Sequence, residues 1–236
     1  MFAKDGLKII RVSLIAVITL IVIWLITDHP LMLALFVLSV LLFLFNLYFF
    51  RDPQRNIPGN PRAVLSPADG KVIQIVEEVE PNYFSERVYR ISVFLSVFNV
   101  HVNRMPISGT VNHVAYHPGK FFAAFKDKAS LENEQTEIGI VGGNGKRVMF
   151  KQIAGLIARR VVCNLREGQK VKAGDRMGMI RYGSRVDIFL PLTVKLVVSV
   201  GQNVFGGESI LAMFEEQETE MSFESEFDEM PVLDTV

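Results

Sequence analysis

Two long apolar runs at the start of the chain constrain its fold more than any other feature. Residues 8–27 and 31–50 are almost entirely apolar, and the few charges of the first run lie at its beginning. Each run is about 20 residues long, which lets a helix cross a hydrocarbon layer of roughly 30 Å. A polar turn with a proline, residues 28–30, separates the two runs. The sequence therefore predicts a transmembrane helical hairpin over residues 1–50.

A secretory signal peptide and a single re-entrant element are the alternative interpretations of the first run. A signal peptide ends in a cleavage site with small residues, and a polar mature chain follows it. Here the second apolar run follows almost at once, and no such site separates the two. The hairpin is therefore the favoured interpretation.

Basic residues flank the predicted hairpin on both sides. Lys4, Lys8 and Arg11 lie at its first end and Arg51 and Arg55 at its second, whereas the turn between the runs has neither Lys nor Arg. Because Lys and Arg gather on the cytoplasmic side of membrane helices, both ends are predicted to face the cytoplasm. The domain that follows is then expected on the cytoplasmic side of the cell membrane.

The zero net charge of the whole chain hides two segments of opposite charge. Residues 51–214 hold 22 Lys and Arg against 14 Asp and Glu, and residues 215–236 hold nine acidic residues and no basic one. A basic domain beside a membrane is attracted to anionic headgroups, although the same charges also suit a scattered, solvated surface. The acidic segment is predicted to be a disordered tail.

Composition and motifs exclude several classes of function. One cysteine rules out a disulfide framework and a multi-cysteine metal site, and the four histidines lack the spacing of a zinc-protease motif. The glycine patterns of nucleotide-binding loops are also missing from the sequence. We therefore expect neither a metal nor a nucleic-acid partner. The single thiol, Cys163, is expected to be a buried and unreactive side chain in a strand.

Residues 51–214 predict a mainly β domain. Short runs of β-branched and aromatic residues alternate with turns rich in Gly and Pro. Many short strands with frequent turns are typical of a β-sandwich or a barrel. Only residues 120–130 suggest a helix. The clearest strand runs are residues 72–76, 89–95, 194–200 and 210–214.

Two segments of this domain resemble each other. Residues 167–175 and 200–208 share the pattern G-Q-x-V-x-x-G-[DE], a turn that leads into a strand. The pattern also resembles the turn of the biotinyl and lipoyl carrier folds. This is a likeness of structure and implies no shared function.

The dipeptide Gly183-Ser184 is the strongest candidate for chemistry. It lies between apolar strands predicted over residues 177–180 and 186–190. Glycine leaves its carbonyl unhindered and its backbone free to adopt unusual angles. The serine hydroxyl can attack that carbonyl if a base takes its proton and hydrogen-bond donors stabilise the oxyanion. An ordinary turn is the alternative interpretation.

A base and an orienting acid are present elsewhere in the chain. His101 lies in a β-like run before a turn, and Asp69 lies in the turn of residues 66–70. The alternative is a structural histidine in a strand and an aspartate that caps its own turn. Sequence alone leaves open whether these two side chains meet Ser184.

Seven motifs along the domain resemble those of one known family. They are RDP (residues 51–53), SPADGKV (66–72), NVHVNRMP (99–106), GTV (109–111), YHPGKF (116–121), QIAGLIARR (152–160) and RYGSRVD (181–187). In their order and spacing the chain resembles the short, bacterial and archaeal type of phosphatidylserine decarboxylase, a membrane enzyme that depends on a pyruvoyl group. The predicted membrane hairpin is also similar to that of the short type.

The resemblance implies a role for each candidate residue. Ser184 attacks the Gly183 carbonyl, and after cleavage Ser184 becomes the pyruvoyl group. His101 acts as the base and later returns a proton, while Asp69 fixes its tautomer as in a catalytic triad. The pyruvoyl ketone takes up the amine of phosphatidylserine and accepts electrons as carbon dioxide leaves, which gives phosphatidylethanolamine.

The resemblance also implies the partners of the chain. The cleaved chains, residues 1–183 and 184–236, are expected to stay associated, and a homo-oligomer is left open. A phospholipid in the membrane is the expected substrate. His117, Lys120 and Arg104 are the candidates for contact with its headgroup.

The chain departs from the family pattern at two places. Gln135 follows Asn-Glu where the family has an arginine, so a substrate contact at that position is not carried over. Tyr182 stands where the family has phenylalanine, which is a mild change.

Three other functions are compatible with the same sequence. The first is the same chemistry on another serine lipid, such as an ether-linked lipid of the archaetidylserine type. The second is a relative that binds anionic lipid without cleaving itself, which the intact Gly183-Ser184 pair disfavours. The third is a membrane-tethered carrier, for which Lys128 would be the attachment site.

Overall fold

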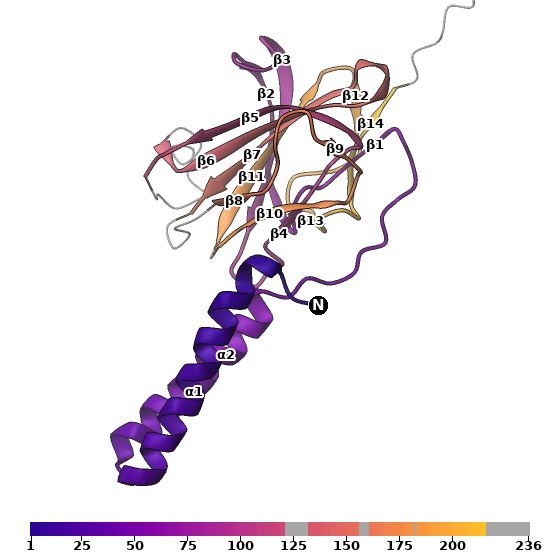
Figure 1. Cartoon of the computed structure of the whole chain (residues 1–236). Helices are drawn as coiled ribbons and strands as arrows, with labels where there is room; N and C mark the ends of the chain where they lie inside the picture. The colour runs from indigo at the N-terminus through magenta and orange to yellow at the C-terminus, as the bar shows by residue number, and fades with distance from the viewer. Residues whose placement is uncertain (121–131, 156–160, 182, 216–236) are drawn as a thin grey trace, which may run out of the picture.

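Both the helical hairpin and the β-rich domain are present in the computed structural model of the chain (Figure 1), which describes residues 1–120, 132–155, 161–181 and 183–215. A short 3-10 turn, η1 (Lys4–Gly6), precedes helices α1 (Leu7–Thr27) and α2 (Pro30–Phe49). The strands are β1 (Ala63–Leu65), β2 (Gly70–Glu80), β3 (Glu86–Leu95), β4 (Val102–Arg104), β5 (Gly109–His117), β6 (Gln135–Val141), β7 (Arg147–Ala154), β8 (Val161–Cys163), β9 (Lys170–Val171), β10 (Arg176–Ile180), β11 (Ser184–Pro191), β12 (Val194–Leu196), β13 (Asn203–Val204) and β14 (Ile210–Phe214), with a second 3-10 turn, η2 (Gly143–Gly145), before β7.

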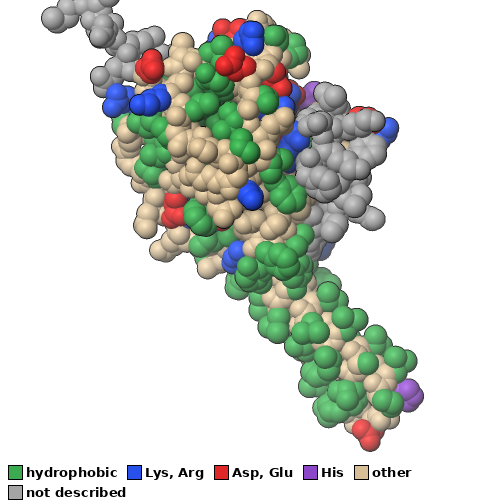
Figure 2. Space-filling model, turned by 180° about the vertical axis from the view of Figure 1, so that it is seen from behind, with side chains coloured by type: hydrophobic (Ala, Val, Ile, Leu, Met, Phe, Trp, Pro, Cys, Tyr) green, Lys and Arg blue, Asp and Glu red, His purple; other side chains and the backbone are tan. Residues whose placement is uncertain are grey.

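The two helices form the predicted hairpin and extend from the β domain as a stalk (Figure 1). At the turn, the Nδ1 atom of His29 accepts the Leu31 N–H at 3.2 Å, and Pro30 occupies the first helical position, where its missing N–H costs nothing. The rings of Trp24 and Phe36 stack between the helices with centroids 6.3 Å apart. Figure 2 shows hydrophobic side chains along the length of the stalk, and both helices are long and apolar enough to cross a membrane.

The β domain is built on one large antiparallel sheet. Its eight strands run in the order β13-β2-β3-β11-β7-β6-β5-β9, and two three-stranded sheets, β1-β14-β12 and β4-β10-β8, complete the domain. The large sheet curls into an open half-barrel (Figure 1). The mainly β prediction is therefore confirmed, and the expected sandwich or barrel is refined to this half-barrel, because strand patterns alone do not specify whether a sheet closes.

Strand β11 lies in the middle of this sheet, and its side chains alternate between the two faces. Val186, Ile188 and Leu190 lie in the main hydrophobic core. Arg185 and Asp187 alternate with them and therefore point to the other face, where both are also buried. Strand β11 pairs along its length with β3 on one side and β7 on the other.

Most of the predicted strands are confirmed. Residues 72–76, 89–95 and 210–214 lie within β2, β3 and β14. The strand expected over residues 194–200 ends at Leu196. A turn follows at residues 199–202, in which the Gln202 N–H donates to the Ser199 carbonyl and the Gln202 side-chain oxygen accepts the Ser199 N–H. The helix suggested for residues 120–130 lies outside the described residues after Lys120, as does the acidic tail after residue 215.

The two similar segments form the same structure. In each, both pattern glycines adopt positive φ, at 81° and 82° for Gly168 and Gly174, and at 92° and 80° for Gly201 and Gly207. Each segment leads through a two-residue strand, β9 or β13, into a longer one, β10 or β14. The second turns of the two segments meet, since a Cβ atom built on Gly207 would lie 3.6 Å from the Cα of Gly174.

Candidate active site

The dipeptide Gly183-Ser184 lies at the start of the central strand β11. Ser184 is its first residue and pairs with Leu95 on β3 and Ala154 on β7. Gly183 has a φ of +80°, a conformation that side chains disfavour and glycine adopts freely. Ser184 is fully buried, and its Oγ atom has no hydrogen-bond partner among the described residues. A buried hydroxyl without a hydrogen-bond partner costs free energy.

His101 lies directly against this dipeptide. The Gly183 N–H donates to Nε2 of His101 at 3.2 Å, and Nδ1 lies 3.0 Å from the carbonyl oxygen of Asn99. Because an amide N–H can only donate, Nε2 must be the acceptor and the imidazole proton must sit on Nδ1. The neighbours of His101 therefore select one neutral tautomer, in which the Nε2 lone pair accepts the Gly183 N–H.

The electrostatic surroundings of His101 favour the same neutral form. Burial lowers its pKa from 6.5 to about 4; the Asn99 carbonyl opposes this shift, and the positive charge of Arg51 adds to it. The imidazole is thus an unprotonated acceptor across the physiological range of pH.

Asp69, the predicted partner of His101, is bound elsewhere. Its two carboxylate oxygens accept from Arg55 at 2.9 and 2.8 Å, and Oδ1 also accepts the Gly206 N–H at 2.8 Å. In the described part of the chain no hydrogen bond joins Asp69 to His101. Burial raises the pKa of the Asp69 carboxyl, and the Gly206 N–H and Arg55 offset part of that rise. Sequence reasoning missed the Asn99 carbonyl because any residue type could supply it.

The three residues predicted to contact the headgroup are all paired with acids. Arg104 is buried, donates to Asp52 at 2.8 Å and also bonds the Gly174 carbonyl. His117 is half-exposed, and its Nε2 lies 3.5 Å from Glu137 Oε2. Lys120 is well exposed and pairs with Glu132 at 2.9 Å. The Arg104 contacts tie the segment after α2 to the domain, which favours a structural role for this side chain.

Gln135, which stands where the family has an arginine, lies in the large sheet. It is the first residue of β6 and lies opposite His117 on β5 and Ile153 on β7. Its side chain is nine-tenths buried, and its Oε1 atom has no hydrogen-bond partner among the described residues. Tyr182 lies outside the described residues.

A buried amide network beside Ser184 was not predicted. The Gln152 Nε2 atom donates to Asn103 Oδ1 at 2.8 Å, and Asn103 Nδ2 donates to the Pro67 carbonyl at 3.3 Å. Gln152 pairs with Val186 on β11, so its side chain lies on the same face of the sheet as Ser184. The network joins the SPADG turn to the strand beside the Gly183-Ser184 bond.

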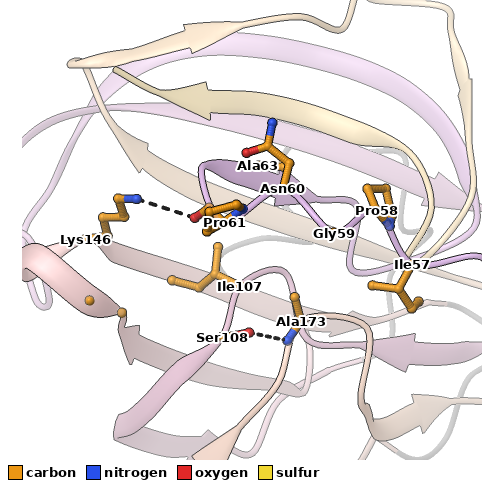
Figure 3. Close-up of a pocket in the computed structure, with 12 residues that line it drawn as sticks. Ile57, Pro58, Gly59, Asn60, Pro61, Ala63, Ile107, Ser108, Lys146 and Ala173 are labelled. Atoms are coloured by element: carbon orange, nitrogen blue, oxygen red, sulfur yellow. Dashed lines mark hydrogen bonds between the residues drawn. The ribbon is translucent and has the colours of Figure 1, made fainter. Parts of the chain in front are cut away.

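Two cavities lie away from this centre. One, of about 580 Å³, lies beneath the segment of residues 57–61 (Figure 3), where the Lys146 ammonium donates to the Pro61 carbonyl at 3.4 Å and the Ser108 hydroxyl accepts the Ala173 N–H at 2.9 Å. Another, of about 560 Å³, is lined by polar residues that include His117 and Gln135. Gly183, Ser184 and His101 line neither cavity.

The single thiol lies in a strand, as predicted, but it is only partly buried. Cys163 ends the short strand β8, and burial raises the pKa of its thiol. A raised pKa keeps a thiol protonated and weakly nucleophilic. The structure therefore supports the prediction of an unreactive cysteine.

Comparison with known proteins agrees with this geometry. The family model for phosphatidylserine decarboxylase matches residues 42–212. The phosphatidylserine decarboxylase proenzyme of Oleidesulfovibrio alaskensis is 49% identical over 184 residues, which cover 78% of this chain and 84% of that protein. The proenzyme of a Wolbachia from Brugia malayi is 53% identical over 177 residues, covering 73% and 77%, and that of Rickettsia africae is 48% identical over 182 residues, covering 75% and 79%. The chain belongs to the phosphatidylserine decarboxylase family.

Proposed function

We propose that Gly183–Ser184 is the bond at which this phosphatidylserine decarboxylase proenzyme cleaves itself. The contact between the Gly183 N–H and Nε2 of His101 is the observation that carries the proposal. It places a neutral base against Gly183, which has a positive φ and precedes a buried, unpartnered hydroxyl. Each of these features favours intramolecular acyl transfer.

The cleavage itself uses only this chain and one water. Ser184 Oγ attacks the carbonyl carbon of Gly183 and gives up its proton to Nε2 of His101; the C–N bond then breaks to leave an ester and a free amine. Elimination removes the α-hydrogen of residue 184 and expels the Gly183 carboxylate. Water then releases ammonia and leaves the pyruvoyl group at position 184.

The surroundings of Ser184 fit such a group. Its side chain is fully buried at the start of β11, and the imidazole of His101 accepts the N–H of the preceding residue, Gly183. A pyruvoyl ketone supplies an electron sink that stabilises the charge left when carbon dioxide departs. His101 is the proposed carrier of the proton at this centre, through Nε2, and burial keeps water from competing.

The two cleaved chains are expected to stay together. The piece that begins at Ser184 contributes β11, which lies between β3 and β7 in the middle of the large sheet. It also contributes β14, the central strand of the β1-β14-β12 sheet. Both pieces therefore share one hydrophobic core, and cutting a single backbone bond removes none of these contacts.

The hairpin is proposed to hold the domain at the cytoplasmic face of the cell membrane, where a serine phospholipid presents its headgroup. Both ends of the hairpin carry basic residues, which favours this orientation. Lys120 is the most exposed of the three headgroup candidates, and His117 follows. On the face in Figure 2, basic and acidic side chains are interspersed rather than gathered in one patch. Self-association of the chain is a separate proposal, which light scattering of the detergent-extracted protein tests.

The deciding experiment is an intact mass of the membrane-extracted protein beside a Ser184→Ala variant. We expect two pieces, residues 1–183 and 184–236, with the second lighter by one ammonia than a peptide that begins with serine. The variant should remain one chain. Carbon dioxide release from vesicles of phosphatidylserine, and from vesicles of an ether-linked serine lipid, then identifies the substrate. A wild-type chain that stays whole would remove the proposal and direct attention to Lys128 as a carrier lysine.

A further inference from the structure

The end of the membrane hairpin packs directly on His101. Phe49 is the last residue of α2, and its ring centroid lies 4.2 Å from that of the His101 imidazole, with the planes tilted by 32°. Both side chains are fully buried. Phe49 therefore links the hairpin directly to the proposed base.

A hydrophobic cluster surrounds this contact, and we call it the hairpin-base cluster. It is separate from the main core and contains side chains from both parts of the chain. Its buried members are Ala3, Phe49, Phe50, Val100, Val102 and Met179, and Phe45 of α2 packs against them. Gly6 makes room for it, because a Cβ atom at that position would collide with the Phe50 ring.

Polar contacts hold the same junction in place. The Tyr48 hydroxyl and the Arg51 guanidinium both donate to the Phe98 carbonyl, at 3.0 and 2.8 Å, three residues before His101. On the other side, Arg181 donates to the Asp5 carbonyl at 3.0 Å, two residues before Gly183. The hairpin end is thus hydrogen-bonded to both the segment before His101 and the segment before Gly183.

We propose that the hairpin end is part of the reaction centre, with Phe49 as the residue that positions His101 against the Gly183 N–H, so that self-cleavage requires a seated hairpin. The inference rests on the proposed function of His101. It makes the membrane segment more than a tether, because a chain whose hairpin is not folded against the domain lacks one wall of the histidine site.

The physical effect of Phe49 on His101 has two parts. The ring restricts the imidazole to the plane in which Nε2 faces Gly183, and it keeps water from the imidazole. Arg51 is the charged group that acts on the imidazole, and it disfavours protonation. Arg181, two residues before Gly183, is bonded to the Asp5 carbonyl. Truncating Phe49 admits water and allows the pKa of His101 to rise toward its ordinary value.

The test compares Phe49→Ala and Phe49→Leu with Phe43→Ala, a matched variant of the same helix whose side chain lies outside the hairpin-base cluster. Full-length precursor is synthesised in the presence of phospholipid vesicles, and the half-time of cleavage is followed at about pH 5.5 and about pH 8. Phe49→Leu keeps apolar bulk without the ring, so it remains informative if Phe49→Ala folds poorly.

We expect Phe49→Ala to cleave more slowly than wild type at both pH values, because the imidazole is no longer held against Gly183. The deficit should be about tenfold larger at the lower pH, because the neutral imidazole is depleted only there once its pKa rises. Phe49→Leu should show a smaller shift of the same profile, and Phe43→Ala none. Phe49 variants with the wild-type profile, or slowed equally at every pH, would overturn the inference. A wild-type precursor that is not cleaved, or a His101→Ala variant that cleaves normally, would instead overturn the proposed function.

Discussion

Gly183 donates its backbone N–H to Nε2 of His101 at 3.2 Å, although 82 positions separate the two residues in the chain. This one hydrogen bond orients the imidazole, selects its tautomer and holds its Nε2 atom at the residue before Ser184. It leads directly to predictions about the histidine, the glycine and the acid that was expected to support them.

Replacing His101 with Gln should slow self-cleavage by about 10² to 10⁴, the usual contribution of a general base. The amide can still accept the Gly183 N–H, so the fold should persist while the proton acceptor is lost. Gel analysis of the two pieces over time gives the rate. His113→Gln, a change on β5, is the control and should cleave normally. Normal cleavage by His101→Gln would exclude this histidine as the base.

Stability should fall as the pH drops from about 6.5 toward about 4. His101 has a folded-state pKa of about 4 against 6.5 in the unfolded chain, so between these values the unfolded state binds more protons. The loss should reach about 3 kcal/mol and then level off, because below the folded-state pKa both states are protonated. Thermal unfolding of Ser184→Ala against pH measures it, and a His101→Gln background should remove this component. An unchanged slope in that background would contradict the assignment.

Breaking the pair between Asp69 and Arg55 should destabilise the domain without moving the pH profile of cleavage. Both side chains are about 7% exposed, and removing one partner of a buried pair costs about 3–5 kcal/mol. The His101 tautomer should survive, because the Asn99 carbonyl holds Nδ1. Asp69→Asn and Arg55→Ala are compared by melting temperature and by cleavage rate against pH. If only Asp69→Asn shifted the pH profile of cleavage, that result would support the triad in which Asp69 orients His101.

Gly183→Ala should fold but cleave more slowly. The nearest atoms to a new Cβ would be Val97 Cγ1 at 3.7 Å and the Leu95 carbonyl oxygen at 3.9 Å, so the side chain has room. The cost is conformational, about 1–2 kcal/mol for a non-glycine residue at positive φ. Melting temperatures in a Ser184→Ala background measure that cost, and a time course of Gly183→Ala alone measures the rate. Cleavage at the wild-type rate would show that the positive φ does not assist the reaction.

Local patterns were sufficient for the hairpin, the β domain, the two similar turns and the Gly-Ser dipeptide. These features depend on short stretches of sequence. An apolar run of membrane length predicts a spanning helix, alternation of apolar and polar residues predicts a strand, and a glycine predicts a turn. Each pattern reflects burial or backbone freedom at that point of the chain. The half-barrel was not predictable in this way, since closure depends on how all eight strands twist and stagger together.

The identities of Gly183, Ser184, His101 and Asp69 as candidates also came from the sequence, through motifs shared with a family. Which of them touch was decided by the tertiary structure alone. The partner of His101 is the Asn99 carbonyl and not Asp69. The sequence could not indicate this, because every residue has a backbone carbonyl. Asp69 is bound instead by Arg55, from the segment after the hairpin. In the sequence, Phe49 cannot be told from the other apolar residues of a membrane helix. Only the packing of the hairpin on the domain places its ring against His101.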